Sequence, residues 1–155
     1  MSYNWNTRTE LLLGAERMEY LSHCHVLVVG LGGVGAYAAE QICRAGIGHM
    51  TIVDADTVNE SNINRQLPAL HSTLGMQKAE VVGKRLLDIN PRLKLTILNE
   101  FLRDERTDEV LSSQKYDFIV DAIDSLSPKV YLLALDSIFV PSMYSTFRLM
   151  KPLEE

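Results

Sequence analysis

The feature that most constrains this chain is a glycine cluster between two apolar runs, within residues 25–54. Residues 26–29 form the first apolar run, and the glycines follow it directly. A helical pattern over residues 34–45 comes next, and a second apolar run ends on Asp54. Strand, glycine turn, helix, strand and acid in this order are typical of the first unit of a nucleotide-binding α/β sheet. We therefore expect a Rossmann-like, doubly wound, mainly parallel sheet. The glycines of the cluster are Gly30, Gly32, Gly33 and Gly35.

The glycine cluster has the properties of a phosphate-binding loop. Gly30 and Gly32 have no Cβ, so the chain can turn sharply there and its amides can approach an anion. A helix that begins at Gly33 or Val34 offers unpaired N–H groups and the positive end of its dipole. We expect Gly35 to let this helix lie close on the preceding strand. A purely structural glycine turn is the less favoured interpretation, because the motif lies between a strand and a helix.

Asp54 completes this first unit. An acid at the end of the second strand commonly hydrogen-bonds a ribose hydroxyl of the bound nucleotide. The motif does not say which nucleotide binds.

Composition bounds the remaining possibilities. The chain has 155 residues, so we expect one domain over residues 1–155, and the hydrophobic fraction of 46% is ample for a core. The net charge of −5 provides no global positive field for nucleic acid, although a local basic patch stays possible. The N-terminus lacks the apolar core of a signal peptide, and no apolar run approaches the roughly 20 residues that span a bilayer. We expect a cytoplasmic protein that does not enter membranes.

The cysteines and histidines do not suggest a metal centre. Cys24 and Cys43 form no C-x-x-C pair, and buried free thiols are the expected state for both. The four histidines share no ligand spacing on one element, so we expect them to be solvated or to cap other groups.

A polar stretch after Asp54 carries a second group of candidate residues. It includes Asn62, Arg65 and Gln66, and Lys78 follows at the start of a predicted helix. A solvated connector would also be polar. An arginine and a lysine added to the glycine loop, however, suit a triphosphate better than a dinucleotide pyrophosphate, which carries only about two charges.

The remaining patterns predict further helices and strands. Residues before His23 read as a helix that Gly14 divides, which could cover the sheet edge or pack on a second subunit. Only four strands are evident, and from residue 140 the pattern fails, so the chain is expected to stop part-way through a fold. The other expected elements are a helix over 77–90, a strand over 93–98, a polar, exposed helix over 107–115, a strand over 116–125 and a helix over 129–139.

Two acids lie at the predicted carboxyl end of the fourth strand. In open α/β sheets, ligands bind beyond the carboxyl ends of the strands. Asp124 is therefore placed to hold Mg²⁺, which prefers carboxylate and phosphate oxygens. Asp121 has the same opportunity, but capping the following helix is an equally good role for it.

Four motifs in order resemble the ubiquitin-activating-enzyme-like adenylating superfamily, the ThiF/MoeB/HesA group. They are GLGGVGAYAAEQICRAGIGHMTIVDADTV, SNINRQ, LGMQKAE and VDAIDS, and the resemblance runs over roughly residues 5–129. Within this group the chain is most similar to the tRNA threonylcarbamoyladenosine dehydratase branch. That branch lacks the zinc cysteines and the ubiquitin-like partner of the carrier-activating enzymes.

The resemblance implies an ATP-dependent enzyme that adenylates a carboxylate. In this branch the carboxylate belongs to a threonylcarbamoyl group on tRNA, and ring closure releases AMP with net loss of water. No catalytic cysteine is needed for this, because proximity within one substrate suffices. The resemblance also implies a homodimer, because Arg8 matches an arginine that reaches the partner's ATP site.

The resemblance assigns roles to matching positions. It implies that Asp54 holds the ribose and that Asp124 binds Mg²⁺. The glycine loop and the cationic residues would contact the phosphates, and Arg65, Lys78 and Asp124 would act in catalysis. The positions implied for phosphate contact are Gly30, Gly32, Gly33, Gly35, Asn62, Arg65 and Lys78.

Three alternatives stay open. The chain could adenylate the C-terminus of a ubiquitin-like sulfur carrier, although the missing C-x-x-C pairs count against this. A nicotinamide-dependent oxidoreductase would explain the glycine loop but would leave Arg65 and Lys78 without a role. A non-catalytic nucleotide-binding module is the third possibility, because the family's substrate-binding part is expected to be absent from a chain of this length.

Overall fold

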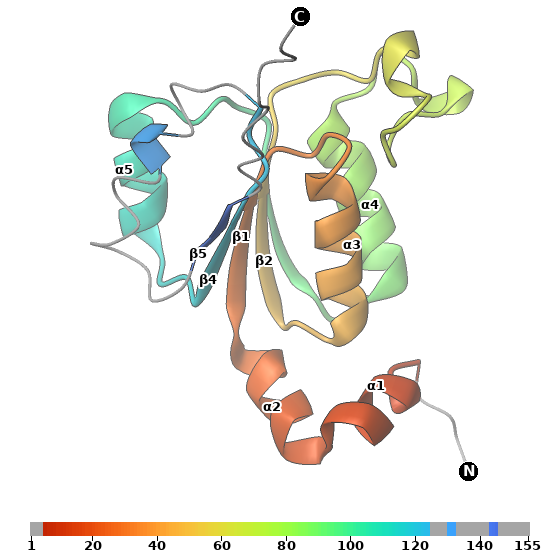
Figure 1. Ribbon diagram of the computed structural model, residues 1–155, viewed down its shortest axis with the longest axis vertical. Helices are drawn as coiled ribbons and strands as arrows, with labels where there is room; N and C mark the ends of the chain where they lie inside the picture. Colours follow the sequence, from red (N-terminus) through yellow and green to blue (C-terminus); the bar gives the residue numbers. More distant parts are fainter. Residues whose placement is uncertain (1–4, 125–129, 133–142, 146–155) are drawn as a thin grey trace, which may run out of the picture.

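A five-stranded parallel sheet organises the chain, in a computed structural model that describes residues 5–124, 130–132 and 143–145 (Figure 1). The strand order is β3-β2-β1-β4-β5, and every neighbouring pair is parallel. This order, with helices on both faces, is the doubly wound arrangement that the glycine motif predicts. The strands are β1 (His25–Val29), β2 (His49–Val53), β3 (Lys94–Leu98), β4 (Phe118–Asp121) and β5 (Met143–Ser145).

The fifth strand corrects the prediction that only four strands are present. β5 is three residues long and pairs with β4 through backbone hydrogen bonds, with Val120 opposite Tyr144. A strand this short has no readable period, so only its partner strand reveals it.

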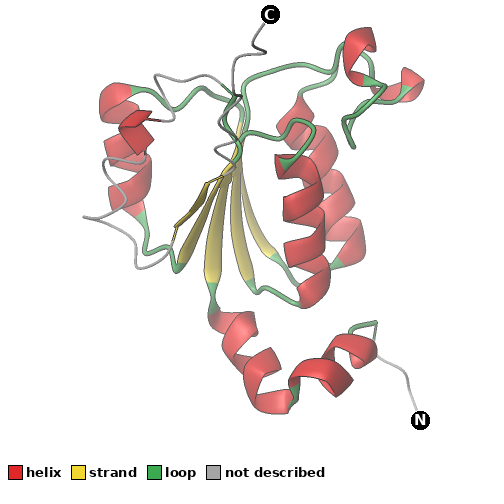
Figure 2. Cartoon of the chain, in the orientation of Figure 1, coloured by secondary structure: helices red, strands yellow, loops and turns green. Residues whose placement is uncertain are grey.

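Helices lie on both faces of the sheet (Figure 2). α3 (Gly35–Ala45) and α4 (Lys78–Ile89) lie side by side on one face, and α5 (Asp104–Ser113) lies on the other. Alternate strand residues divide accordingly, because successive side chains of a strand point to opposite faces. Val26 and Val28 enter the core beneath α3 and α4, whereas Leu27 and Val29 enter the core beneath α5.

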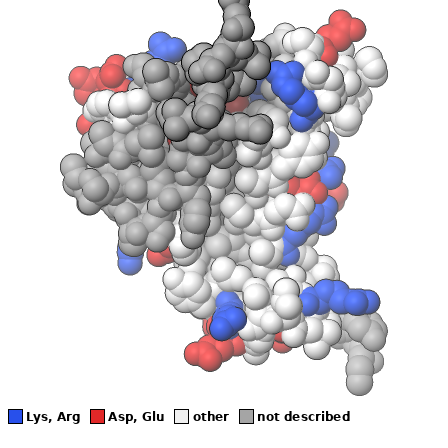
Figure 3. Space-filling view, viewed as in Figure 1, with Lys and Arg blue, Asp and Glu red and all other residues white. Residues whose placement is uncertain are grey.

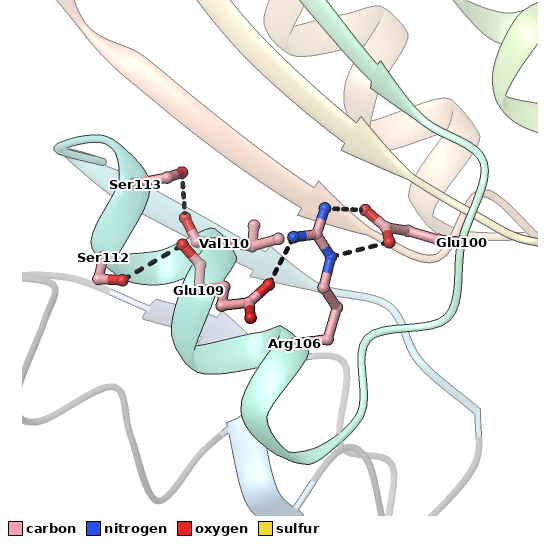
Figure 4. Close-up of polar contacts among 6 residues, drawn as sticks. All are labelled: Glu100, Arg106, Glu109, Val110, Ser112 and Ser113. Atoms are coloured by element: carbon pink, nitrogen blue, oxygen red, sulfur yellow. Dashed lines mark hydrogen bonds and ion pairs between the residues drawn. The ribbon is translucent and has the colours of Figure 1, made fainter.

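α5 is more buried than its polar sequence suggests. The exposed helix expected over 107–115 begins at Asp104 and buries Thr107, Val110 and Leu111 against the sheet. Its outer surface carries Arg106, whose guanidinium bonds both carboxylate oxygens of Glu100 and one of Glu109, each pair at 2.7–2.9 Å (Figure 4). Only the face of α5 that carries these three residues is buried. Three apolar or β-branched residues at helical spacing suffice to dock a short helix on a sheet.

The N-terminal segment forms two short helices, as the position of Gly14 predicts. α1 (Thr7–Leu13) and α2 (Ala15–His23) meet at Gly14, whose φ of +84° ends the first helix. They lie beyond the amino ends of the strands rather than over a sheet edge (Figure 1). Neither helix contains a buried residue.

The free cysteines are buried as expected, but one histidine differs from the prediction. Cys24 and Cys43 are unpaired and buried. His25 is half-buried, its Nε2 lies 2.9 Å from the Thr51 hydroxyl, and its ring contacts Tyr116. Burial lowers the pKa of His25, so it is a neutral packing residue rather than a solvated one. Within the described residues, no helix has the length and apolar character needed to cross a membrane.

Candidate nucleotide site

The glycine loop at the end of β1 tolerates no side chains at two positions. Gly30 has a φ of +89°, and a Cβ there would lie 2.7 Å from the carbonyl oxygen of Ala122. A Cβ on Gly35 would collide with the carbonyl oxygen of Gly30. Gly30 and Gly35 therefore let the chain reverse tightly and bring α3 against the sheet, as the sequence predicts.

The outer part of the loop is open. Gly33 and Val34 are exposed, and α3 begins at Gly35 rather than at the predicted Gly33 or Val34. No side chain caps the start of α3. The first N–H groups of α3 and the positive end of its dipole therefore face this loop. Gly32 also lies on it, where a Cβ would meet only the Gln66 side chain, at 3.6 Å.

Asp54 fastens the glycine loop to the end of β2. Its Oδ2 accepts a hydrogen bond from the Leu31 N–H at 2.7 Å, and its Oδ1 accepts one from the Asp56 N–H at 2.8 Å. The residue is only 8% exposed. Burial raises the pKa of Asp54, while these two N–H groups and the nearby Lys78 ammonium oppose the rise. Each oxygen keeps a further lone pair, so a ribose contact stays a prediction beside this structural role.

The polar stretch after Asp54 forms a long loop between Asp56 and Lys78, which we call the excursion. Backbone hydrogen bonds join its two ends in a short neck. Lys78 N–H donates to the Asp56 carbonyl, and Val58 N–H donates to the Met76 carbonyl, at 2.9 and 2.8 Å. Thr57 and Gln77 form an isolated antiparallel bridge between these bonds. The excursion includes two single turns, η1 (Glu60–Asn62) and η2 (His71–Thr73). Its neck thus places the start of α4 beside the end of β2.

Lys78 lies in this neck with a partner that sequence reasoning missed. Its side chain is only 6% exposed, and Nζ lies 2.9 Å from Asp56 Oδ2. Asp56 is itself exposed, with 53% of its side chain open to solvent. The sequence carries a signal for this partner, because a second acid, Asp56, follows Asp54 by two positions after β2.

Asn62 and Arg65 occupy the excursion in different ways. Asn62 is buried, and its Oδ1 accepts the Asn59 N–H at 3.0 Å, so it has a structural role. Arg65 is exposed and donates to the Ser61 carbonyl and to Asn64 Oδ1. No carboxylate of the described residues pairs with Arg65. Its side chain packs against the glycine loop, since a Cβ on Gly33 would lie 3.7 Å from Arg65 Cγ.

Gln66, the neighbour of Arg65, leaves an acceptor without a partner. Its Oε1 is buried and receives no hydrogen bond from the described residues, while Nε2 lies near Gly32. Gln66 therefore joins Arg65 in the contact between the excursion and the glycine loop.

The two acids after β4 differ sharply in exposure. Asp121 is fully buried, and its Oδ1 accepts the Ile123 N–H at 3.0 Å, which stabilises the turn that leaves the strand. Asp124 is exposed at the carboxyl end of the sheet. No cluster of three or more metal-ligating side chains exists in the described part of the chain. Asp124 suits Mg²⁺ only in the way this ion is usually held, by one or two carboxylates together with substrate phosphates.

Arg8 is a predicted site residue that the structure places far from the glycine loop. It is exposed on α1, beyond the amino ends of the strands, whereas the glycine loop lies at their carboxyl ends (Figure 1). Arg8 therefore cannot serve the nucleotide site of its own chain in this arrangement.

One cavity of the described residues lies away from the glycine loop. It measures about 580 Å³ and lies between the outer face of α4 and the loop after Gln66. Leu67, Leu70 and Leu87 contribute to its apolar lining. The case for a nucleotide site rests on the glycine loop and the residues beside it, because a phosphate is bound at a helix N-terminus without an enclosed cavity.

Comparison with known proteins places this geometry in a family. The ThiF family pattern matches residues 3–136. The tRNA threonylcarbamoyladenosine dehydratase of Escherichia coli K12 is 39% identical over 133 residues, which cover 84% of this chain and 49% of that protein. The enzyme of the same name from Bacillus subtilis is 40% identical over 127 residues, covering 82% and 50%. The chain thus spans about half the length of these relatives.

A second group of relatives has another activity. The molybdopterin-synthase adenylyltransferase of Escherichia coli K12 is 34% identical over 116 residues, covering 75% of this chain and 46% of that protein.

Solved structures agree with the sequence comparisons. The tRNA threonylcarbamoyladenosine dehydratase TcdA of Escherichia coli, solved in complex with ATP, superimposes with a TM-score of 0.84 at 37% identity. The superposition covers 88% of this chain and 56% of that one. TcdA was also solved in complex with AMP, with the same TM-score. The glycine loop, the sheet order and these matches lead to one conclusion: this chain belongs to the ThiF family.

Proposed function

We propose that this chain carries the ATP site of an adenylating enzyme that acts on threonylcarbamoyladenosine in tRNA. The observation that carries the proposal is the junction at the carboxyl end of the sheet. There the glycine loop, Asp54, Arg65 and Lys78 come together from segments far apart in the sequence. Relatives with about 40% identity are tRNA threonylcarbamoyladenosine dehydratases, and one of them was solved with ATP.

The proposed reaction begins with transfer of an adenylyl group. A substrate carboxylate oxygen attacks the α-phosphorus of ATP, the bond between the α-phosphorus and the bridging oxygen breaks, and pyrophosphate leaves. An atom within the same substrate then attacks the activated carbonyl carbon, the ring closes and AMP leaves. Holding one substrate in place is sufficient for the second step, because the nucleophile and the carbonyl belong to one molecule. Cys24 and Cys43 are buried free thiols, and the proposed route uses neither of them.

Each part of the site would have a different role in this reaction. The amides of the glycine loop and the N-terminus of α3 would bind phosphate, and Asp54 would hold both the loop and the ribose. Arg65 and Lys78 would stabilise the charge that develops on the leaving pyrophosphate. Asp124 would hold Mg²⁺, which neutralises phosphate charge when it is bound. Asn62 would contact phosphate and would also support Arg65 by stabilising the fold of the excursion.

The tRNA part of the proposal rests on the relatives. In the described part of the face drawn in Figure 3, basic and acidic side chains are interspersed rather than gathered into one basic patch. Nucleic acid is normally held by clustered positive charge. We therefore propose that residues 1–155 act mainly as one nucleotide-binding domain, in the cytoplasm where tRNA is available, and that most tRNA contacts lie outside this surface.

A homodimer is the proposed assembly. Helices of seven and nine residues without any buried side chain are marginal in water, which favours a partner for α1 and α2. Leu11 and Leu12 are 80% and 81% exposed. The position of Arg8, far from the site of its own chain, is compatible with a contribution to a partner's site.

Adenylation of a sulfur-carrier protein is the second candidate. The match to molybdopterin-synthase adenylyltransferase favours it, but that match has the lower identity, 34% against 39%. Copurification of a small protein with a Gly-Gly tail would support this alternative.

Binding of ATP with Mg²⁺ should be titrated against NAD⁺ on the same purified protein, with Lys78→Ala and Lys84→Ala as variants. Lys84 is an exposed lysine of the same helix and serves as the matched control. We expect ATP to bind in preference to NAD⁺, Lys78→Ala to weaken ATP binding and Lys84→Ala to leave it unchanged. Preference for NAD⁺ would overturn the proposal. Release of AMP with threonylcarbamoyladenosine-containing tRNA is the second measurement, and ATP binding without it would favour a non-catalytic module.

A further inference from the structure

Asp56 holds Lys78 at two points. The backbone carbonyl of Asp56 accepts the Lys78 N–H at 2.9 Å, and its carboxylate Oδ2 accepts a hydrogen bond from Lys78 Nζ, also at 2.9 Å. The first bond sets where α4 begins, and the second sets where the ammonium lies. One residue thus places both the backbone and the charge of Lys78.

Asp56 is also connected to the glycine loop. Its N–H donates to Asp54 Oδ1, and Asp54 Oδ2 in turn accepts the Leu31 N–H. A continuous series of hydrogen bonds therefore runs from the glycine loop through Asp54 and Asp56 to the first residue of α4. A change in the position of Asp56 would therefore displace both the glycine loop and the start of α4.

The ammonium of Lys78 needs such a partner. A lysine stem has four rotatable carbons, and its ammonium is strongly hydrated, so a lysine that is only 6% exposed is stable as a cation only when it is paired. The ammonium has three N–H donors, and the Asp56 carboxylate takes one of them. The other donors leave Lys78 able to bind a phosphate while Asp56 still holds it.

We propose that Asp56 is a positioning residue that aims the Lys78 ammonium at the nucleotide phosphates before the nucleotide binds. This inference rests on the proposed function, because it assumes that the anion bound beside the glycine loop is a nucleotide phosphate. Fixing the ammonium in advance lowers the ordering cost of binding and so raises affinity. If Asp56 instead competed with phosphate for Lys78, removal of the carboxylate would tighten nucleotide binding rather than weaken it.

A double-mutant cycle on ATP affinity separates these roles. Asp56→Ala should weaken ATP binding about tenfold or more, close to the effect of Lys78→Ala, as expected for one charge-assisted hydrogen bond. In the Lys78→Ala background, Asp56→Ala should have little further effect, because both changes remove the same contact. Asp56→Asn, which keeps an acceptor oxygen, should have an intermediate affinity and also covers the case in which Asp56→Ala does not fold. Glu100→Ala is the matched control, because it removes an ion-paired acid away from the site (Figure 4).

Three results would overturn the inference. These are unchanged ATP affinity in Asp56→Ala, tighter binding in that variant, or losses that simply add in the double variant. The first result would show that the ion pair does not affect nucleotide binding. The second would show that Asp56 competes with the phosphate for Lys78, and the third that Asp56 acts independently of Lys78.

A second measurement tests the hold on Lys78 without any nucleotide. The rate at which a small amine-acylating reagent modifies Lys78 should rise in Asp56→Ala, as measured by peptide mass spectrometry, while Lys84 in the same sample keeps its rate. An unchanged Lys78 rate would overturn the inference. If the native protein bound no ATP, the proposed function would fail, and the acylation rate would still show whether Asp56 positions the ammonium.

Discussion

At the scale of single residues, Gly35 is the position where the fold and the site depend on one missing atom. A Cβ there would collide with the Gly30 carbonyl and approach Ala122 Cβ at 2.9 Å. We expect Gly35→Ala to lower the free energy of unfolding by about 1–3 kcal/mol, as for other overpacked sites, and to abolish ATP binding. Urea unfolding and an ATP titration measure both effects.

Gly33→Ala is the matched control for this change. The nearest atoms to a Cβ on Gly33 belong to Arg65 at 3.7 Å, an ordinary contact. Gly33→Ala should therefore keep the stability of the native protein. Equal destabilisation by the two variants would show that the tight packing of α3 on β1 is not what Gly35 provides.

Arg65 should act on the transition state rather than on the fold. It is exposed, and among the described residues its side chain bonds only its own excursion, so its removal leaves none of their buried groups unpaired. We expect Arg65→Ala to slow AMP formation by roughly 100-fold or more, the usual loss for a group that stabilises developing charge, with an unchanged melting temperature. Arg92→Ala, an exposed arginine beyond the far end of α4, should keep the native rate. A native rate in Arg65→Ala would remove Arg65 from the mechanism.

Cys43 should resist chemical modification in the folded protein. Burial raises the pKa of its thiol to about 11, and its Sγ–H lies against the Leu86 carbonyl. At pH 8 the thiolate fraction is then very small, so iodoacetamide should label Cys43 only after unfolding. Rapid labelling under native conditions, read by mass spectrometry, would contradict the packing of α3 on α4.

At the scale of elements, Glu40 links the two helices that cover one face of the sheet. It lies on α3, only 8% of its side chain is exposed, and it pairs with Arg44 on the same helix and with Arg85 on α4. The Arg85 guanidinium, with help from Arg44, holds the pKa of Glu40 below its usual value, although burial opposes this. This ion-paired cluster fixes α3 against α4, and so fixes the glycine loop at one end of α3 relative to Lys78 at one end of α4.

The lowered pKa of Glu40 has a defined consequence for stability. Because the pKa is lower in the folded state, the contribution is present above the unfolded-state pKa and is lost as the pH falls through the folded-state value. Glu40→Gln should therefore lower the free energy of unfolding by about 1–3 kcal/mol at pH 7 and by progressively less as the acid range is entered. Urea unfolding at several pH values tests this, and Glu109→Gln, at an exposed position of α5, should show little change at any pH.

Element prediction succeeded where period and length were both clear. The helix expected over 77–90 is α4, where the pattern also places Ala79, Val82, Leu86 and Ile89 inward; the first three are buried and Ile89 is partly buried against the same core. The prediction was wrong for the exposure of α5 and for the number of strands, because neither the docking of a polar helix nor a three-residue strand leaves a periodic signal.

At the scale of the whole molecule, the N-terminal helices should matter through a second copy of the chain. Leu12→Lys places a charge on a surface that we propose to be buried in a homodimer, so it should weaken dimerisation strongly and leave the monomer folded. Sedimentation equilibrium measures the dissociation constant. Leu87→Lys, at an exposed leucine of α4, is the control for a general effect of added charge. A monomeric native protein, or an unchanged dimer in Leu12→Lys, would contradict the proposed assembly.

The sequence by itself determined the first nucleotide-binding unit of this protein. Glycines at 30, 32, 33 and 35 between a strand and a helix permit few backbone paths, so the sheet type, the loop and the close packing of α3 follow from local sterics. The membership in an adenylating family was likewise carried by ordered motifs, and the comparisons confirm it.

Only the tertiary structure decided how the remaining site residues are held. Leu31, which bonds Asp54, lies 23 positions away in the sequence, and Asp56, which pairs with Lys78, lies 22 positions away. Asp56 contacts Lys78 because the neck of the excursion brings the start of α4 beside the carboxyl end of β2. Such contacts depend on which segments meet in space, and a local pattern of residue types carries no information about the distance between them.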